Sequence, residues 1–489
     1  MNGDIIFYYD APTSGTSVDA TVDINLTGAN SYLNGDIFIS GNPNPPVGKD
    51  QVNKMKLALS KGATWTTDRN DSFTNILKLD GGIVNLVGGE SQQVSIGDLS
   101  GTGIVNVNTS TKDGKTFKTA VLAVENVAAG TELTLAMNGL TADDILDTTA
   151  ALNALGSSLT VATGNAIQTR LIREGDVRGE IVQQIDAEGN QGAVVERNNT
   201  KLESFKGVNA ASLVQWRNQV NHLTKRLGDV RLQQGDAGAW ARVYGGEYKW
   251  GDANHVDMTS TTVQAGGDAR VGDWIVGGAF SYSDSSFDLD NGDGDGDLYT
   301  IALYGSRMFE KGSYIDFVAR YGYIKNDFKA GNMDVALDSN AFGLSVETGH
   351  TFKFMERAYV EPQIEVSYGY AQGDDAVASN GVLLEQDDYQ NLITRIGLRT
   401  GFDFPENAGT IYAHVSYSYD FLGDADGMAS KDGMRTSLSE DLGGGWVTYG
   451  IGGQLRLGQS IFAYGELERS TGGDVENPWA FNVGVRYLF

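Results

Sequence analysis

Hydrophobic and polar residues alternate with a period of two at the end of the chain. Aromatic or apolar side chains occupy the odd positions from Trp479 to Phe489, whereas small or polar residues such as Asn482 and Arg486 occupy most even positions. Because successive side chains of a strand point to opposite faces, this pattern predicts a β-strand with one apolar and one polar face.

The same alternation recurs through the C-terminal half of the chain. In 358–373, for example, Ile364 and Val366 share one face and Glu365 lies on the other. Charged groups on one face and apolar groups on the other are typical of a closed barrel in an outer membrane, with a polar lumen. Twelve strands are predicted, near 238–250, 256–270, 272–287, 297–309, 313–328, 337–355, 358–373, 384–404, 409–423, 445–457, 459–471 and 478–489.

The predicted connections alternate between short and long. Short ones such as 310–312 alternate with longer acidic ones such as 288–297 and 423–441. Outer-membrane barrels have short periplasmic turns and long extracellular loops, so the pattern places Phe489 on the periplasmic side. The segment 288–297 is rich in Asp but lacks the residue order of a calcium loop, and we expect a solvated acidic loop there.

A different periodicity precedes the strands and predicts a helix over 208–233. Its apolar stripe has spacings of three and four residues, and its other faces are basic. About 20 helical residues span a hydrocarbon core, so this helix could fill a barrel lumen. A coiled-coil dimer is the alternative, but fewer than three heptads support it poorly. The stripe comprises Leu213, Trp216, Val220, Leu223, Leu227 and Val230, and the basic residues are Arg217, Lys225, Arg226 and Arg231.

The N-terminal part, residues 1–140, contains short β-prone runs such as 82–87 and 103–107, separated by turns rich in Gly, Asn and Asp. This favours a partial β-solenoid, and a β-sandwich is the alternative because no strict repeat length is visible. Residues 141–207 are a mixed connecting region. The expected fold class is therefore all-β with one linker helix: a solenoid (1–140), the connecting region, the helix (208–233) and a twelve-stranded transmembrane barrel (234–489).

Composition narrows the function. The chain has 36 Lys+Arg against 63 Asp+Glu, a net charge of −27, which argues against nucleic-acid binding. It has no Cys, and its four His residues show no metal-ligand spacing, so neither cofactor nor metal is expected. The first residues do not form a signal peptide, and we expect the chain to begin within a longer protein.

The sequence Lys-Arg-Leu-Gly-Asp-Val-Arg at 225–231, followed by Gly-Ala-Trp-Ala-Arg at 238–242 and a terminal Phe489, resembles the translocator of type Va autotransporters. The resemblance covers a little over half of the chain. It implies a barrel in the bacterial outer membrane, a helix that remains in the pore and plugs it, and an N-terminal passenger that is secreted or displayed at the cell surface. Residues 99–107 resemble the capping end of a passenger β-helix, which assists passenger folding in the family.

The resemblance also implies partners. Tyr487 and Phe489 would form a signal for the barrel-assembly machinery, and periplasmic chaperones, outer-membrane lipid and lipopolysaccharide would be contacted by a monomeric barrel. The ligand of the passenger is not indicated. Two alternatives from other classes are a porin-like or adhesin-anchoring barrel with a permanently attached surface domain, and a soluble secreted β-protein.

Some autotransporters cleave themselves inside the pore. An Asn side-chain amide attacks its own backbone carbonyl, and the short distance within one residue gives a high effective molarity. By resemblance, Asn221 is the attacking residue, Asp316, Glu347 and Glu365 are the lumen acids that orient its amide, and Arg469 is a lumen arginine. Relatives have a second Asn where this chain has His222. No other catalytic activity is expected. Alternatively, Asn221 is a polar helix residue and the acids line the pore and anchor Lys225, Arg226 and Arg231.

Overall fold

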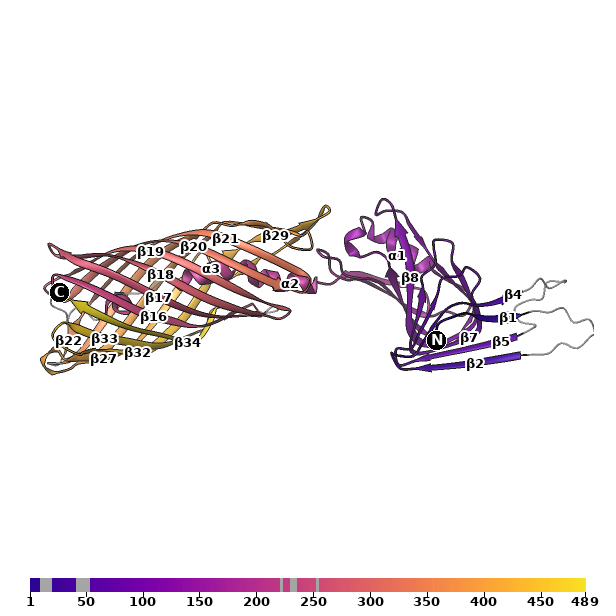
Figure 1. Cartoon of the computed structure of the whole chain (residues 1–489), viewed down its shortest axis with the longest axis horizontal. Coiled ribbons are helices and arrows are strands. Elements are labelled where there is room, and N and C mark those ends of the chain that lie inside the picture. Colours follow the sequence, from indigo (N-terminus) through magenta and orange to yellow (C-terminus); the bar gives the residue numbers. More distant parts are fainter. Residues whose placement is uncertain (9–19, 41–52, 220–222, 229–234, 252–254, 355) are drawn as a thin grey trace, which may run out of the picture. The chain divides into compact units, whose positions relative to one another are not determined.

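A computed structural model describes residues 1–8, 20–40, 53–219, 223–228, 235–251, 255–354 and 356–489. The chain forms two compact units, Met1–Asn199 and Thr200–Phe489 (Figure 1).

The first unit is a stack of parallel strands. β2 (Ala20–Thr27), β5 (Asn53–Ser60), β7 (Phe73–Leu86) and β8 (Gln93–Thr111) pair in this order, each parallel to the next. The register places Leu57 beside Leu77 and Leu77 beside Leu99, and all three side chains are buried. This is the architecture of a β-solenoid, in which each coil buries its apolar residues against the next.

Further strands complete the coils, and a helix packs beside them. Helix α1 (Thr148–Ser157) is capped by Asp147, whose side chain accepts a hydrogen bond from Ala150 N at 2.9 Å, and the helix buries Leu152 and Leu155. Residues 99–107 lie in β8 and are followed by β10 and β11 on the next coil. The remaining strands are β1 (Ile5–Tyr8), β3 (Tyr32–Asn34), β4 (Ile37–Ser40), β6 (Thr64–Thr67), β9 (Phe117–Thr119), β10 (Val121–Val127), β11 (Glu132–Asn138), β12 (Leu159–Thr163), β13 (Ile167–Ile172), β14 (Ile181–Ile185) and β15 (Gln191–Glu196).

The second unit is a closed antiparallel barrel of twelve strands (Figure 1). The first and last strands pair, with Gly238 opposite Leu488, so the sheet has no free edge. The barrel strands are β16 (Ala237–Trp250), β17 (Val256–Val271), β18 (Trp274–Leu289), β19 (Gly292–Met308), β20 (Ser313–Ala330), β21 (Met333–His350), β23 (Ala358–Ala371), β26 (Tyr389–Asp403), β27 (Gly409–Asp420), β32 (Gly444–Arg456), β33 (Ile461–Thr471) and β34 (Glu476–Leu488).

The barrel strands follow the predicted alternation. Leu303, Ile396 and Ile451 are exposed on the outer face, whereas Asp316 and Glu365 are buried inside. An apolar outer face and a polar lumen suit a barrel that crosses a membrane. The twelve predicted strands are confirmed.

The acidic segment 288–297 differs from its prediction. It is not a loop: β18 ends at Leu289 and β19 begins at Gly292, so it forms a tight hairpin. At the start of β19, Gly294 and Gly296 face inward and the aspartates that alternate with them point outward. An added Cβ at Gly294 would lie 2.3 Å from the Phe328 ring. Glycine and aspartate thus keep the period of two that a strand requires.

Two other connections, at the same barrel end as the 288–297 hairpin, are long, as predicted. They contribute a small four-stranded sheet of β24 (Asp375–Val377), β25 (Leu383–Gln386), β29 (Gly427–Lys431) and β30 (Met434–Ser437). β28 (Asp424–Ala425) pairs with β31 (Glu440–Asp441). At the opposite end, β22 (Phe352–Lys353) pairs with β23.

The helical segment is broken, whereas a single helix over 208–233 was predicted. The described helices are α2 (Thr200–Asn209), α3 (Ala211–Arg217) and α4 (Leu223–Leu227). The break between α2 and α3 lies where Asn209 donates to the loop carbonyls of Ala425 and Leu438, at 3.0 and 2.7 Å. The apolar spacing from which one helix was predicted contains no information about these tertiary bonds. Among the described residues, no helix is long and apolar enough to cross a membrane.

Candidate functional site

The helical segment lies in the barrel lumen, and Trp216 of α3 packs against the wall. The indole is buried, and its Nε1 donates to the carbonyl of Phe342 at 3.2 Å. Glycines of β20, β21 and β23 make room for it, since an added Cβ at Gly322, Gly343 or Gly369 would lie 2.5, 3.3 or 3.1 Å from the ring. Leu213, from the same predicted stripe, is also buried.

The polar side chains of α3 bond to the wall as well. Asn326 of β20 donates to the side chain of Gln215 at 2.9 Å. Arg217 donates to the carbonyl of Leu442 at 2.9 Å and lies over the Trp446 ring, 4.5 Å from its centroid. The segment is therefore fixed to a polar lumen on several sides.

The basic residues of α4 pair with lumen carboxylates. Arg226 donates to both oxygens of Asp316, each at 2.8 Å, and lies 4.5 Å from the centre of the Tyr304 ring. Lys225 Nζ lies 2.5 Å from Glu468 and 3.7 Å from Glu466. Hydrogen bonds between a cation and a carboxylate are roughly twice as strong as those between neutral groups.

The three predicted lumen acids lie in one row across neighbouring strands. Asp316 is opposite Glu347, Glu347 is opposite Glu365, and Glu365 is opposite Arg395. Arg395 donates to Glu365 at 2.9 Å and lies 3.5 Å from Glu347. The structure thus brings these acids together and supplies a cation between two of them.

Other predicted residues have different outcomes. Val220, Asn221, His222 and Arg231 lie outside the described residues. Arg469 was predicted to face the lumen, but this prediction is wrong. It has the strand parity of exposed Leu467 on β33, opposite to that of Glu466 and Glu468, and is exposed on the outer face. Tyr487 and Phe489 are exposed on the outer side, and their role in barrel assembly stays a prediction.

The sequence reasoning missed several lumen residues. Glu466 and Glu468 could have been found from strand parity, because they flank outward-facing Leu467. The same parity places Arg320 of β20 on the lumen face, where it donates to the carbonyl of Gln219. Asn209 has no such signal, because its partners belong to loops more than 200 residues later.

A cavity of about 170 Å³ remains between the helical segment and one side of the wall. Its lining is charged and polar, and includes Lys225, Arg395, His414, Glu466 and Glu468. The lumen is therefore filled unevenly, and water or small ions have room beside α4.

Comparisons with known proteins place the barrel in a family. Residues 239–468 match the family model of the autotransporter beta-domain. The pertactin autotransporter of Bordetella parapertussis is 28% identical over 294 residues, which are 58% of this chain and 32% of that protein. Serine protease EspP of Escherichia coli O157:H7 is 30% identical over 294 residues, 56% of this chain and 22% of that protein. The chain spans less than a third of the length of these relatives.

Two solved structures also resemble the chain. The translocator domain of NalP from Neisseria meningitidis is 14% identical, with a TM-score of 0.48, and the match covers 58% of this chain and 98% of that one. The transport unit of AIDA-I from Escherichia coli is 16% identical, with a TM-score of 0.49, over 60% of this chain and 100% of that one. On the match of residues 239–468, the C-terminal part of the chain belongs to the autotransporter β-domain family, whose barrels lie in the bacterial outer membrane.

Proposed function

We propose that this chain is a type V secretion translocator that delivers or displays its own N-terminal unit at the cell surface. The observation that carries the proposal is the path of the chain through the lumen. Asn209 bonds to the loops at one barrel end, and β16 begins at Ala237, beside Leu488, at the other. Helices α3 and α4 lie between these two ends, so the chain N-terminal to Asn209 leaves the barrel lumen at the end with the long loops.

Surface labelling tests this direction. One variant carries an epitope in the exposed turn at 186–190 of the first unit, and its matched control carries the epitope in the short turn at 310–312. With a signal peptide supplied, antibody on intact cells should label the first variant, and the second only after permeabilisation. Labelling of the first variant only after permeabilisation would contradict the proposal.

The helical segment is proposed to plug the pore. Deleting 208–231 removes Trp216 and the cations that bond the wall, and should produce a conducting pore in planar bilayers. Deleting residues 1–140 is the control and should leave the conductance low. Unchanged conductance after the first deletion would favour the alternative, a porin-like barrel with a separate surface domain.

We further propose that the passenger is released by cyclisation of Asn221. Its side-chain nitrogen would attack its own carbonyl carbon, the bond to the nitrogen of His222 would break, and that nitrogen would leave as a protonated amine. The acid row supports this, and so do the contacts that flank 220–222: Arg320 holds Gln219, and Asp316 of the same strand holds Arg226.

Intact mass after export tests the cleavage. A fragment that begins at His222 is expected from the parent chain, whereas Asn221→Asp should stay whole, and His222→Asn should cleave at least as fast as the parent. Finding only whole protein in the parent would overturn cleavage, and would favour an adhesin-anchoring barrel with a permanently attached surface domain.

A further inference from the structure

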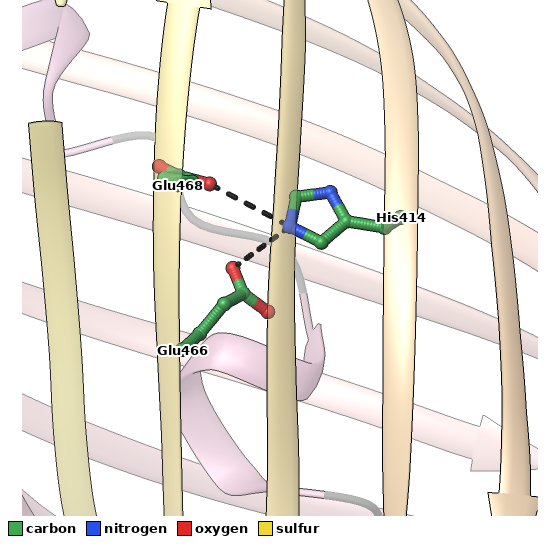
Figure 2. Close-up of side chains that lie close together, drawn as sticks. All are labelled: His414, Glu466 and Glu468. Atoms are coloured by element: carbon green, nitrogen blue, oxygen red, sulfur yellow. Dashed lines mark ion pairs between the residues drawn. The ribbon is translucent and has the colours of Figure 1, made fainter. Parts of the chain in front are cut away.

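Three side chains meet in the lumen across an intervening strand (Figure 2). His414 lies on β27 and Glu466 and Glu468 lie on β33, while β32 runs between them. The imidazole Nε2 lies 3.5 Å from a Glu466 oxygen and 4.0 Å from a Glu468 oxygen. The three ligand atoms all lie within 4.8 Å of one another.

A glycine permits this approach. Gly450 of β32 pairs with His414 on one side and Glu468 on the other. An added Cβ there would lie 2.6 Å from His414 Nε2 and 2.9 Å from Glu468 Cβ. Any other residue at 450 would occupy the space in which the imidazole and the carboxylates face each other.

A neighbouring tyrosine orients one of the carboxylates. The Tyr412 hydroxyl donates to Glu466 Oε2 at 2.7 Å, whereas the other oxygen, Oε1, faces His414. Gly452 makes room for this tyrosine, since its Cβ would lie 2.5 Å from the ring. Hydrogen bonds from outer groups commonly hold metal-binding carboxylates in this way.

The charge at this place is balanced by the helical segment. Lys225 brings one ammonium to the two carboxylates of Glu466 and Glu468. Buried carboxylates are costly without a compensating cation. If Lys225 is withdrawn, two negative charges and an imidazole face a cavity of about 170 Å³ that can admit an ion and its water.

We propose that His414, Glu466 and Glu468 bind a divalent transition-metal ion such as Zn²⁺ when Lys225 is withdrawn or replaced. One imidazole and two carboxylates with an open water position are a ligand set that Zn²⁺ accepts. A tetrahedral ion with metal–ligand distances of about 2.0–2.2 Å holds its ligand atoms roughly 3.4 Å apart. The His414–Glu466 separation of 3.5 Å already fits this spacing, and the other ligand atoms must move closer. The ion and Lys225 compete for the carboxylates, so metal binding loosens the attachment of α4 to the wall.

Metal binding is measured directly on the folded protein, whether or not that protein exports a passenger. The full chain in detergent is titrated with ZnCl₂ by calorimetry, with MgCl₂ in parallel. The Lys225→Met variant should bind one Zn²⁺ at least tenfold more tightly than the parent protein does. The same variant should bind Mg²⁺ at least tenfold more weakly than it binds Zn²⁺. Adding His414→Phe to Lys225→Met should remove at least 90% of the gain.

Two controls keep the result specific. His255 lies 3.0 Å from Asp257 on the exposed end of β17, and His255→Ala in the Lys225→Met background should leave Zn²⁺ binding unchanged. Folding is judged by heat-modifiable migration in gels. If the His414 variant fails to fold, Glu466→Gln replaces it, and the absorption bands of bound Co²⁺ report the loss of metal binding. Equal binding with and without His414, loss of binding in the His255 variant, or no one-to-one binding in Lys225→Met would each overturn the proposal.

Discussion

At the residue scale, glycines shape the inner wall of the barrel. Rings from neighbouring strands lie where a side chain would otherwise be. An added Cβ would lie 2.5 Å from the Trp240 ring at Gly266, 2.5 Å from Tyr304 at Gly277 and 2.6 Å from Tyr314 at Gly349. The rings therefore lie against the adjacent strand and leave the centre of the lumen for the helical segment.

The pocket of Trp216 can be tested through one of its glycines. Gly322→Ala places a methyl group about 2.5 Å from the indole. We expect overpacking to lower the free energy of unfolding by about 1–3 kcal/mol. The barrel should then lose its heat-modifiable migration in gels at a lower temperature. Gly267→Ala is the matched control, because its Cβ would meet only the Gly238 carbonyl, at 3.5 Å. In a Trp216→Leu background the effect of Gly322→Ala should shrink, and an unchanged effect would contradict the pocket.

Asn209 joins the helical segment to the long loops at one end of the barrel. It donates to the carbonyls of Ala425 and Leu438, and accepts from Gln386 at 3.1 Å and Tyr389 at 3.0 Å. Asn209→Ala should cost about 1–3 kcal/mol because it leaves buried partners unsatisfied. We expect more frequent openings in single-channel recordings. Asn165→Ala in an exposed turn is the control, and identical traces for the two variants would refute this role.

At the element scale, α4 depends on β20 through one buried ion pair, Arg226 with Asp316. Asp316→Asn leaves a buried guanidinium without its counter-charge, which costs about 3–5 kcal/mol. We expect α4 to leave the wall and the conductance to rise. Adding Arg226→Gln should restore part of the block, since no buried charge then remains. A double variant that conducts as much as the single one would contradict this coupling.

The strands were predicted more successfully than the helix for a physical reason. Strand parity repeats over twelve elements, and lipid on one side and water on the other constrain every position of each strand. This parity also placed Asp316 and Glu365 on the lumen face, whereas Glu347 was assigned to the lumen by resemblance. The helix boundary depends instead on tertiary bonds such as those of Asn209, which periodicity does not contain.

The same reasoning explains why the meeting of His414 with Glu466 and Glu468 was not predicted. The three residues come together only through the register of β27, β32 and β33 and through the absence of a side chain at Gly450. Sequence spacing shows neither. Arg469 is the opposite case, because it was placed by resemblance, and the parity of β33 puts it on the outer face.

At the scale of the whole molecule, the two units gain stability in different ways. The first unit adds parallel coils whose contacts are with the next coil, so its stability is close to a sum over neighbours. The barrel has no free edge, and in detergent or lipid its backbone groups have no water to replace their partners. Denaturants that act through water should therefore affect the units unequally.

We expect two separate transitions when the full chain in detergent is titrated with urea. The chain has seven Trp residues, of which only Trp65 belongs to the first unit. Since Trp65 is fully buried, its fluorescence should change at low urea while the barrel keeps its heat-modifiable migration. Trp65→Phe should remove the first fluorescence change, that of the solenoid, and leave the second, that of the barrel. Trp479→Phe, on the outer face of β34, is the control and should keep both changes. A single transition with coincident midpoints by fluorescence and migration would mean that the solenoid and the barrel unfold as one cooperative body, and would contradict the independence of the two units.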